Sequence, residues 1–282
     1  MSLRETSSGG TGSLDQLRAE NEALRERIRQ IEKERVEYLQ NVSHQIVAPL
    51  NAMKWHIENL TEVRVSVDRA KKVLRSIYSQ ATLAVHLAKN FSLMSNLEGD
   101  HTLSNLQEPL QEVDLHRLLV NLADDFQPQG WDQNIKIMVD DSHFDTRPPI
   151  LAIKPLISQV FSNILENAVK YSNSGSIIVV RGKHDPGRGI FTVQILNQGI
   201  PLQVKDEQRI FERATRTEQA RRKYPAGTGF GLYIAKRIVA IHEGTIRANT
   251  ENDWTVFSVS LTVEGLKGKA RFRAQQNHTL DR

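Results

Sequence analysis

The chain has no cysteine among its 282 residues, so disulfide bonds and thiolate metal sites are excluded. No apolar run approaches the ~20 residues that a membrane-spanning helix needs, and the sequence does not open on a signal-peptide pattern. A membrane segment is therefore not expected in this chain. We predict a cytoplasmic protein or a soluble part of a larger one.

The sequence also lacks an excess of charge of either sign. Its formal net charge is only +4, and 37 Lys and Arg residues are mixed with 33 Asp and Glu residues. This balance does not indicate a nucleic-acid-binding surface, so no nucleic acid is expected among the partners. Residues 1–13 are rich in Ser and Gly and predict a flexible lead, and residues 266–282 predict a basic, solvated tail.

Residues 14–42 carry the heptad pattern of a coiled coil. Apolar positions alternate three and four apart over about four heptads, with charged residues between them. One seam position holds Asn21, which favours a parallel dimer in register because its side chain can pair with that of its symmetry mate. A single amphipathic surface helix is the alternative, but the repeat favours a homodimer. The seam consists of Leu14, Leu17, Asn21, Leu24, Ile28, Ile31, Arg35, Tyr38 and Val42.

Residues 37–97 predict a helical hairpin. The apolar pattern continues through residues 46–60, breaks near residues 61–66, and resumes in a second helix. Two such hairpins in a parallel dimer would form a four-helix bundle. Residues 98–112 predict a linker. The predicted core stripe of the second helix consists of Ala70, Val73, Ile77, Ala81, Ala84, Ala88, Phe91 and Met94.

Residues 113–265 predict an α+β two-layer sandwich, with helices on one face of a mostly antiparallel sheet. A short strand and a helix are expected over 113–127, and a longer helix over 152–172. A third helix is expected over 229–244, ended by Gly244. Strands are expected at 134–141, 176–183, 190–196, 245–250 and 254–263.

His44 lies on the flank of the predicted hairpin. It is two residues from Val42 and from Ile46, and two helical positions are ~200° apart, so its side chain points away from the core stripe. Pro49 leaves the carbonyl of Gln45 without its helical partner, so a bend is expected there. An accessible imidazole beside a local kink suits approach by another group, although an isolated surface His is usually without function.

The helix "NILENAVKYS" groups four polar residues on one face. Asn163, Asn167, Lys170 and Tyr171 fall at helical spacing, and two amides, an ammonium and a phenol suit a phosphate with a hard cation. A solvated face is the alternative interpretation. Two Gly-containing turns follow, "LNQGIPL" and "GTGFGL". The second precedes a helix, where backbone N–H groups can close on phosphate oxygens.

The chain resembles a two-component sensor histidine kinase from about Glu37 to Leu261. "SHQIVAPL" resembles the phospho-acceptor box, "NILENAVKYS" the N box, "LNQGIPL" the first glycine box, "RIFER" the F box and "GTGFGL" the second glycine box. The resemblance implies a HisKA-type dimerisation and phosphotransfer hairpin followed by a catalytic domain with the Bergerat ATP-binding fold. It implies ATP and Mg²⁺ as cofactors, and it implies phosphotransfer to an aspartate of a response-regulator receiver domain.

The resemblance also implies residue roles. His44 would take the γ-phosphoryl group of ATP, with Gln45 beside it, and Asn167 with Asn163 would bind Mg²⁺. Lys170 would contact phosphate and Tyr171 would lie against the nucleotide. The remaining nucleotide contacts would come from the first glycine box (Asn197 on the adenine amine, Gly199 at the base), the second glycine box (Gly227, Thr228, Gly229, Gly231 and Leu232) and Arg213 and Arg216 in a lid over residues 211–226.

Several positions depart from the family pattern. Gln45 replaces an acid that can accept the imidazole proton, which predicts slow autophosphorylation. Ala48 replaces a Thr or Asn that positions a hydrolytic water, which predicts weak phosphatase activity. Asn197 and Pro201 replace the usual Asp and Gly, which predicts weakened ATP affinity. These substitutions leave an alternative open: a degenerate kinase that acts as a nucleotide- or partner-binding scaffold.

Overall fold

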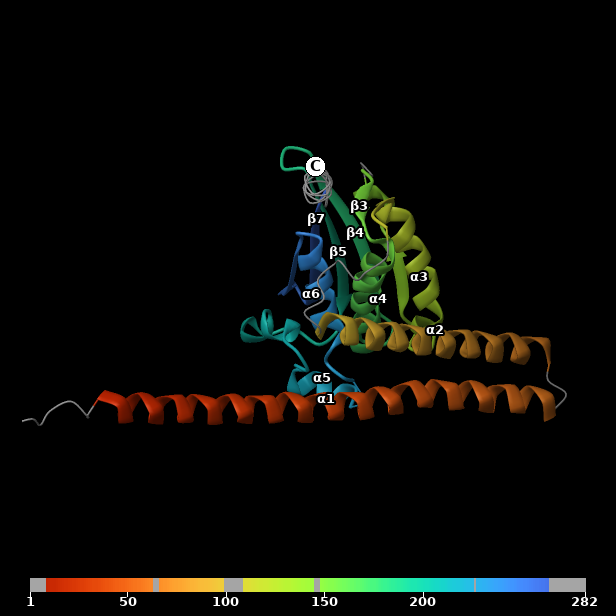
Figure 1. The fold of residues 1–282 in the computed structure, drawn as a ribbon. Coiled ribbons are helices and arrows are strands. Elements are labelled where there is room, and N and C mark those ends of the chain that lie inside the picture. Colours follow the sequence, from red (N-terminus) through yellow and green to blue (C-terminus); the bar gives the residue numbers. More distant parts are fainter. Residues whose placement is uncertain (1–8, 63–65, 99–108, 145–147, 226, 264–282) are drawn as a thin grey trace, which may run out of the picture. The chain divides into compact units, whose positions relative to one another are not determined.

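The computed structural model describes residues 9–62, 66–98, 109–144, 148–225 and 227–263, in the order of two long helices followed by an α+β domain (Figure 1). The chain divides into two compact units, Met1–His44 and Gln45–Arg282. Most of the predicted lead, most of the predicted linker and the predicted basic tail lie outside the described residues. Within the described ranges, no helix is both long enough and apolar enough to cross a bilayer.

Helix α1 spans Gly9–Glu62 and continues without interruption through Pro49. In the first unit, four apolar positions of the predicted coiled-coil seam are between 45% and 58% exposed in the single chain: Leu17, Leu24, Ile28 and Ile31. Within the described part of the first unit, these seam positions are therefore left largely uncovered. Such a stripe of exposed aliphatic side chains is the surface that a second helix would cover.

Helix α2 spans Val67–Glu98 and forms the second arm of the hairpin. Ser66 caps its start, since its hydroxyl accepts from the Arg69 N–H at 3.4 Å and its carbonyl from the Ala70 N–H at 2.9 Å. Within the second unit the two arms are joined by a 2.8 Å hydrogen bond between His56 Nε2 and Ser76 Oγ.

The predicted core stripe of α2 is only partly buried within the single chain. Ala84 and Met94 are buried, but Ala88 and Phe91 are exposed. The buried stripe is instead Ser79, Ala84, His86, Leu87, Asn90 and Met94. The reason is tertiary: α2 packs a different face against helices α3, α4 and α6 of the α+β domain.

The main sheet has five strands in the order β2-β4-β5-β7-β6. All neighbouring pairs are antiparallel except β2 and β4, which run parallel. The prediction of a mostly antiparallel sheet is thus confirmed. The strand bounds are Lys136–Val139 (β2), Ile177–Asp185 (β4), Ile190–Gln198 (β5), Thr245–Glu251 (β6) and Trp254–Thr262 (β7).

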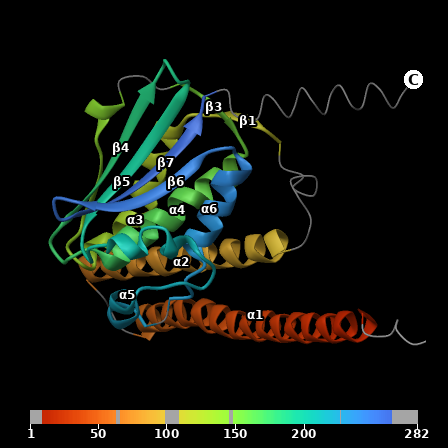
Figure 2. The same cartoon turned by 90° about the vertical axis from the view of Figure 1, so that its left-hand side faces the viewer.

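Three helices cover one face of this sheet: α3 (Leu115–Trp131), α4 (Lys154–Tyr171) and α6 (Gly231–Ile241) (Figure 2). Asp114 caps α3, because its side chain accepts from the Arg117 N–H. The core between the two layers includes Phe126, Phe161, Ile164 and Ile234, each no more than 2% exposed. Each such side chain contributes roughly 1.5–3 kcal/mol by leaving water. The predicted two-layer α+β sandwich is therefore confirmed.

Several elements differ from the prediction in extent. The first strand, β1, begins at Gln111 inside the predicted linker and pairs antiparallel with β3 (Ile150–Ala152), which the sequence analysis joined to the following helix. Helix α6 ends at Ile241, and the left-handed residue after it is Glu243 rather than Gly244. Gly244 is needed for a different reason, since a Cβ there would lie 2.5 Å from the Ser260 carbonyl oxygen.

His242 links the end of α6 to the start of α4. Its side chain is 3% exposed, Nδ1 bonds the Ile238 carbonyl oxygen at 2.8 Å, and Nε2 accepts from the Ile153 N–H at 3.1 Å. Both ring nitrogens are thus used by a neutral imidazole with its proton on Nδ1. Burial lowers the pKa of His242, although the bond to Ile238 opposes this.

We expect the free energy of unfolding to fall as the pH falls below about 6.5. Below that pH the imidazole of His242 binds a proton in the unfolded chain, whereas in the folded chain burial keeps it neutral. The neutral form is stabilised by the fold, so this contribution is fully present above that pH and is lost toward the lowered folded-state pKa. Urea unfolding at pH 8 and pH 5.5 measures the drop. His242→Gln should shrink it and cost about 1–3 kcal/mol at pH 8. His184→Gln, on β4, should keep the wild-type drop; an unchanged drop in His242→Gln would contradict the assignment.

Candidate nucleotide-binding site

The polar face of α4 is mostly covered rather than solvated. Asn163 is fully buried, whereas Asn167, Lys170 and Tyr171 are half-buried. The Oδ1 atom of Asn163 accepts a 2.7 Å hydrogen bond from Asn90 of α2. Asn163 Nδ2 is buried without a hydrogen-bond partner. The alternative of an ordinary wet face therefore does not describe the N-terminal half of this face.

Asn167 has an amide oxygen that suits a hard cation. Its Nδ2 donates to the backbone carbonyl of Asn163 at 2.9 Å, which turns Oδ1 the other way. Mg²⁺ takes oxygen ligands and is commonly held by only one or two protein groups plus phosphate oxygens and waters. Among the described residues, no group of three or more His, Cys, Asp or Glu side chains could hold a metal by itself. The donor set thus fits a metal that arrives with phosphate.

Glu166 and Lys170 form a buried ion pair one helical turn apart, with 2.6 Å between Oε1 and Nζ. Burial alone would raise the pKa of the Glu166 carboxyl, but the Lys170 ammonium and His86 hold that pKa below its ordinary value. Burial likewise opposes the charge of Lys170, yet the Glu166 carboxylate raises its pKa. Lys170 also lies over the ring of Tyr224, 4.8 Å from its centre. A fixed positive charge is therefore held at this face.

The first glycine box packs directly on the end of α4. Asn197 is 2% exposed near the end of β5, and Ser172 and Gly199 form a β-bridge. A Cβ at position 199 would overlap the carbonyl group of Tyr171 and approach Asn197 Nδ2 to 3.0 Å. Only glycine allows this approach of the turn to the helix end.

The second glycine box lies at the N-terminus of α6. Gly229 has φ +74° in the left-handed region, and a Cβ there would lie 2.9 Å from the backbone of Ala214. A Cβ at Gly231 would lie 3.1 Å from Asn163 Oδ1, so this loop adjoins the polar face of α4. Thr228 accepts from the Phe230 N–H at 3.4 Å, and Leu232 is half-buried in the first turn. The N-terminus of a helix is a general site for anions, because its first backbone N–H groups have no partner within the helix.

The segment predicted as a lid contains a short helix, α5 (Glu218–Lys223). Arg216 holds the segment together, because its guanidinium donates to the carbonyl oxygens of Ala220, Tyr224, Pro225 and Gly227. Its remaining contact is with the Tyr171 hydroxyl at 3.4 Å. Arg216 therefore acts inside the segment in this structure.

Lys223 ties the same segment to the end of α4. Its Nζ donates to the carbonyl oxygens of Tyr171 at 3.0 Å and Ser172 at 2.6 Å. At the other end of the segment, the guanidinium of Arg213 lies over the ring of Phe230, 5.7 Å from its centre. The end of the predicted lid with Arg213 thus contacts the glycine loop, and the end with Lys223 contacts the C-terminal end of α4.

His44 and Gln45 fall at the boundary between the two units, on α1. His44 is exposed, as its position on the helix predicts, and Gln45 is half-buried. The other predicted site residues belong to the α+β domain, where the structure brings α4, the β5 turn, the α6 N-terminus and the lid segment together.

The sequence analysis missed four residues at this site: His86 and Asn90 of α2, Glu166 and Lys223. The Glu166–Lys170 pair could have been found from its i, i+4 spacing. Thr217, whose hydroxyl accepts from the Ala220 N–H, is a helix-capping signal that would have indicated α5. The contacts of His86 and Asn90 with α4 have no local signal, since they join residues more than 60 positions apart.

Comparison with known proteins gives the class of the domain. Residues 153–265 match the family described as "Histidine kinase-, DNA gyrase B-, and HSP90-like ATPase". Most of the α+β domain is therefore similar to the ATPases of this class.

A curated relative and two solved structures are similar to this chain over a longer part of its length. The heme sensor protein HssS of Staphylococcus aureus is 28% identical over 243 residues, covering 84% of this chain and 49% of HssS. Full-length ShkA, solved in complex with AMPPNP, is similar in fold with TM-score 0.52 and 22% identity over 80% of this chain and 45% of that one. Histidine kinase AdeS of Acinetobacter baumannii gives TM-score 0.50 and 16% identity, covering 78% of this chain and 98% of AdeS.

The chain is thus similar in sequence to a heme sensor protein and similar in fold to histidine kinases, which agrees with the resemblance carried by its motifs. It spans about half the length of the curated relatives that it matches.

Gly199→Ala tests the close packing of the first glycine box on α4. The added methyl group would collide with the Tyr171 carbonyl, and overpacking of this kind costs about 1–3 kcal/mol. Urea unfolding measures the loss. Gly187→Ala, in the β4–β5 turn, is the matched control: its Cβ would meet its nearest neighbour at 3.5 Å, an ordinary contact, so its effect should stay within about 0.5 kcal/mol. Equal stability of the two variants would refute the packing argument.

Proposed function

We propose that the chain is an ATP-dependent protein histidine kinase that phosphorylates itself on His44. The observation that carries the proposal is the packing of two glycine turns against the polar face of α4, which also holds Lys170 in an ion pair with Glu166. An amide face, an anion-binding helix start and a fixed cation are together the requirements of a magnesium-bound triphosphate. The resemblance of the motif around His44 and the exposure of this residue support it as the acceptor.

In the proposed reaction, a neutral imidazole nitrogen of His44 attacks the γ-phosphorus of ATP. The N–P bond forms, the bond to the β–γ bridging oxygen breaks, and ADP leaves with that oxygen's electron pair. The imidazole proton passes to solvent, because the Gln45 amide can accept a hydrogen bond but not the proton. Phosphoryl transfer depends mainly on positioning and charge neutralisation, so this chemistry remains open to a site without an acid next to the acceptor.

We assign the nucleotide contacts as follows. Asn167, with Asn163, would hold Mg²⁺, which would neutralise phosphate charge; Lys170 would contact phosphate oxygens. The adenine would lie between Asn197, Gly199 and Tyr171. The α6 start would bind phosphate through the box from Gly227 to Leu232, and Arg213 and Arg216 would reach the phosphates after the lid reorganises. The neighbour ShkA was solved with AMPPNP, which supports a nucleotide at this domain.

We further propose that residues 14–42 transmit a signal as a coiled coil, that residues 37–97 form the dimerisation and phosphotransfer domain, and that residues 113–265 form the catalytic domain, joined by the linker at 98–112. Exposed apolar residues of the hairpin support a homodimeric four-helix bundle: Val47, Leu50, Trp55, Ile57, Leu74 and Val85. The phosphoryl group would pass from His44 to a receiver-domain aspartate in the cytoplasm.

Incubation with γ-³²P-ATP and Mg²⁺ tests the acceptor. Wild-type protein should gain an acid-labile, base-stable label, and His44→Gln should gain none. His56→Gln is the matched control, since His56 lies on the same helix and is engaged by Ser76. It should keep at least half the wild-type label. A chain that binds nucleotide but is never labelled would be a scaffold instead.

Gln45→Glu should raise the rate of autophosphorylation, because a carboxylate can accept the imidazole proton that an amide cannot. General-base help typically contributes ~10²-fold at the low end of its range. Single-turnover labelling at saturating ATP separates this gain from a change in ATP affinity. Gln45→Ala should instead be slower than wild type; a Glu variant no faster than wild type would remove the hypothesis.

A further inference from the structure

A buried polar cluster joins α2 to α4. It consists of His86 and Asn90 from α2 and Gln159, Asn163 and Glu166 from α4, all of them 8% exposed or less, and we call it the α2–α4 latch. Asn90 Nδ2 donates to Asn163 Oδ1 at 2.7 Å, and Gln159 Nε2 donates to Asn90 Oδ1 at 2.9 Å. His86 Nε2 lies 3.0 Å from the same Asn163 oxygen. The same His86 Nε2 lies 3.3 Å from Asn90 Nδ2. Asn90 therefore takes one acceptor position of the Asn163 oxygen, and the tautomer of His86 with its proton on Nε2 takes the other.

The latch is incompletely satisfied. Among the residues that the structure describes, Asn163 Nδ2 and His86 Nδ1 are buried without hydrogen-bond partners, and Glu166 Oε2 lies 3.4 Å from His86 Nδ1. Unpaired buried groups oppose the contact that buries them. A permanent helix interface would be more stable with apolar side chains at these positions. The polar composition therefore suits a contact that opens.

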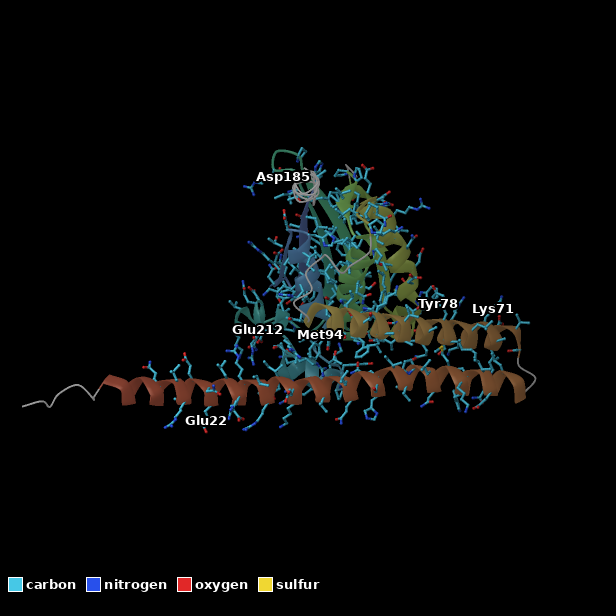
Figure 3. All side chains as sticks on the ribbon, viewed as in Figure 1. Glu22, Lys71, Tyr78, Met94, Asp185 and Glu212 are labelled. Carbon is cyan, nitrogen blue, oxygen red and sulfur yellow. The ribbon has the colours of Figure 1, made fainter. Side chains whose placement is uncertain are left out.

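The rest of the α2 contact combines polar groups from α3 with the buried apolar side chains of Ala84, Leu87 and Met94. The Tyr78 hydroxyl donates to Asp125 Oδ1 at 2.7 Å, and Gln129 Nε2 donates to the Ser79 carbonyl oxygen at 3.4 Å. Met94 is fully buried toward the other end of α2 (Figure 3). Tyr78 thus offers a way to weaken the docking of α2 without touching the latch.

We propose that α2 and a magnesium-bound nucleotide compete for Asn163, so that docking of α2 through His86 and Asn90 withholds a metal ligand from the catalytic domain. The proposal rests on the proposed function and adds regulation to the same site. His86 and Asn90 are positioning residues in this scheme, because they act on the nucleotide only through Asn163. Linkage between the two equilibria is reciprocal. If docking of α2 weakens the binding of Mg²⁺–nucleotide by some factor, then bound Mg²⁺–nucleotide must favour the undocked state of α2 by the same factor.

Calorimetric titration of the full chain with AMPPNP gives one dissociation constant in Mg²⁺ and one in EDTA. The dissociation constant in EDTA divided by that in Mg²⁺ is the Mg²⁺-dependent gain in affinity. Asn90→Ala should increase the Mg²⁺-dependent gain in affinity about fivefold or more over wild type. Tyr78→Phe should increase it about twofold, because a larger fraction of molecules is undocked. Ser92→Ala, an exposed α2 position, should match wild type.

The double variant Asn90→Ala/Asn163→Ala checks the route, since it removes the ligand that the opened latch should free. Its Mg²⁺-dependent gain should fall back to the wild-type ratio or below. A ratio within twofold of wild type in Asn90→Ala, together with no change in Tyr78→Phe, would overturn the proposal. A gain that survives loss of Asn163 would overturn it as well.

Spin labels give a second readout that needs no activity. Because the chain has no cysteine, Lys89→Cys and Lys236→Cys would be its only labelling sites. Electron–electron distance measurements should show a longer population with Mg²⁺–AMPPNP than with AMPPNP in EDTA, and also in the nucleotide-free Asn90→Ala protein. One unchanged distance throughout would contradict the latch. Lack of AMPPNP binding by every variant would count against the proposed function, and the nucleotide-free distances would still decide whether Asn90 holds α2.

Discussion

Helix α4 is covered on nearly all sides, and the rest of the domain depends on how its polar face is satisfied. The apolar face packs into the core, where Phe161 and Ile164 are buried. The other face buries Asn163 and Glu166, and buried polar groups must find partners because water can no longer supply them. Glu166 finds Lys170, whereas the Asn163 amide finds only half of its partners within the described residues. Whatever covers this face must therefore bring hydrogen-bonding groups of its own.

Three segments supply such groups. Helix α2 brings Asn90 to Asn163, the lid segment brings Lys223 to the last carbonyls of α4, and the α6 start brings Gly231 within van der Waals reach of the Asn163 oxygen. A magnesium-bound triphosphate would offer a fourth set of oxygens and charge. Because these groups contact the same face of α4, binding of one changes the free energy with which the others bind. Such coupling can be carried by helix α4 alone.

Much of this arrangement could be predicted from the sequence, and the failures share a cause. The period of α4, the Gly-containing turns and the antiparallel strands are local patterns, and the structure confirms them. Gly199 could be predicted as a close approach, although its partner, the Tyr171 carbonyl, could not. The stripe of α2 that packs on the α+β domain was not predicted, because Ala, Val and Phe at helical spacing indicate the core of a helical bundle. The α+β domain instead buries the face with His86 and Asn90, since these match the amides of α4. No local signal could reveal that match.

The two faces of α2 therefore have different tasks. The polar stripe contacts α4 through partly unsatisfied hydrogen bonds, which makes the contact reversible. The exposed apolar positions, such as Phe91 and Leu74, remain for a surface that can bury them permanently. Hydrophobic contact is non-directional and tolerates small rotations, whereas an amide pair at 2.7 Å does not. A small rotation of α2 would thus break its hydrogen bonds to Asn163 while the contacts of an apolar bundle persist. A signal that arrives as a helix rotation could therefore undock α2 from α4 and leave the bundle intact.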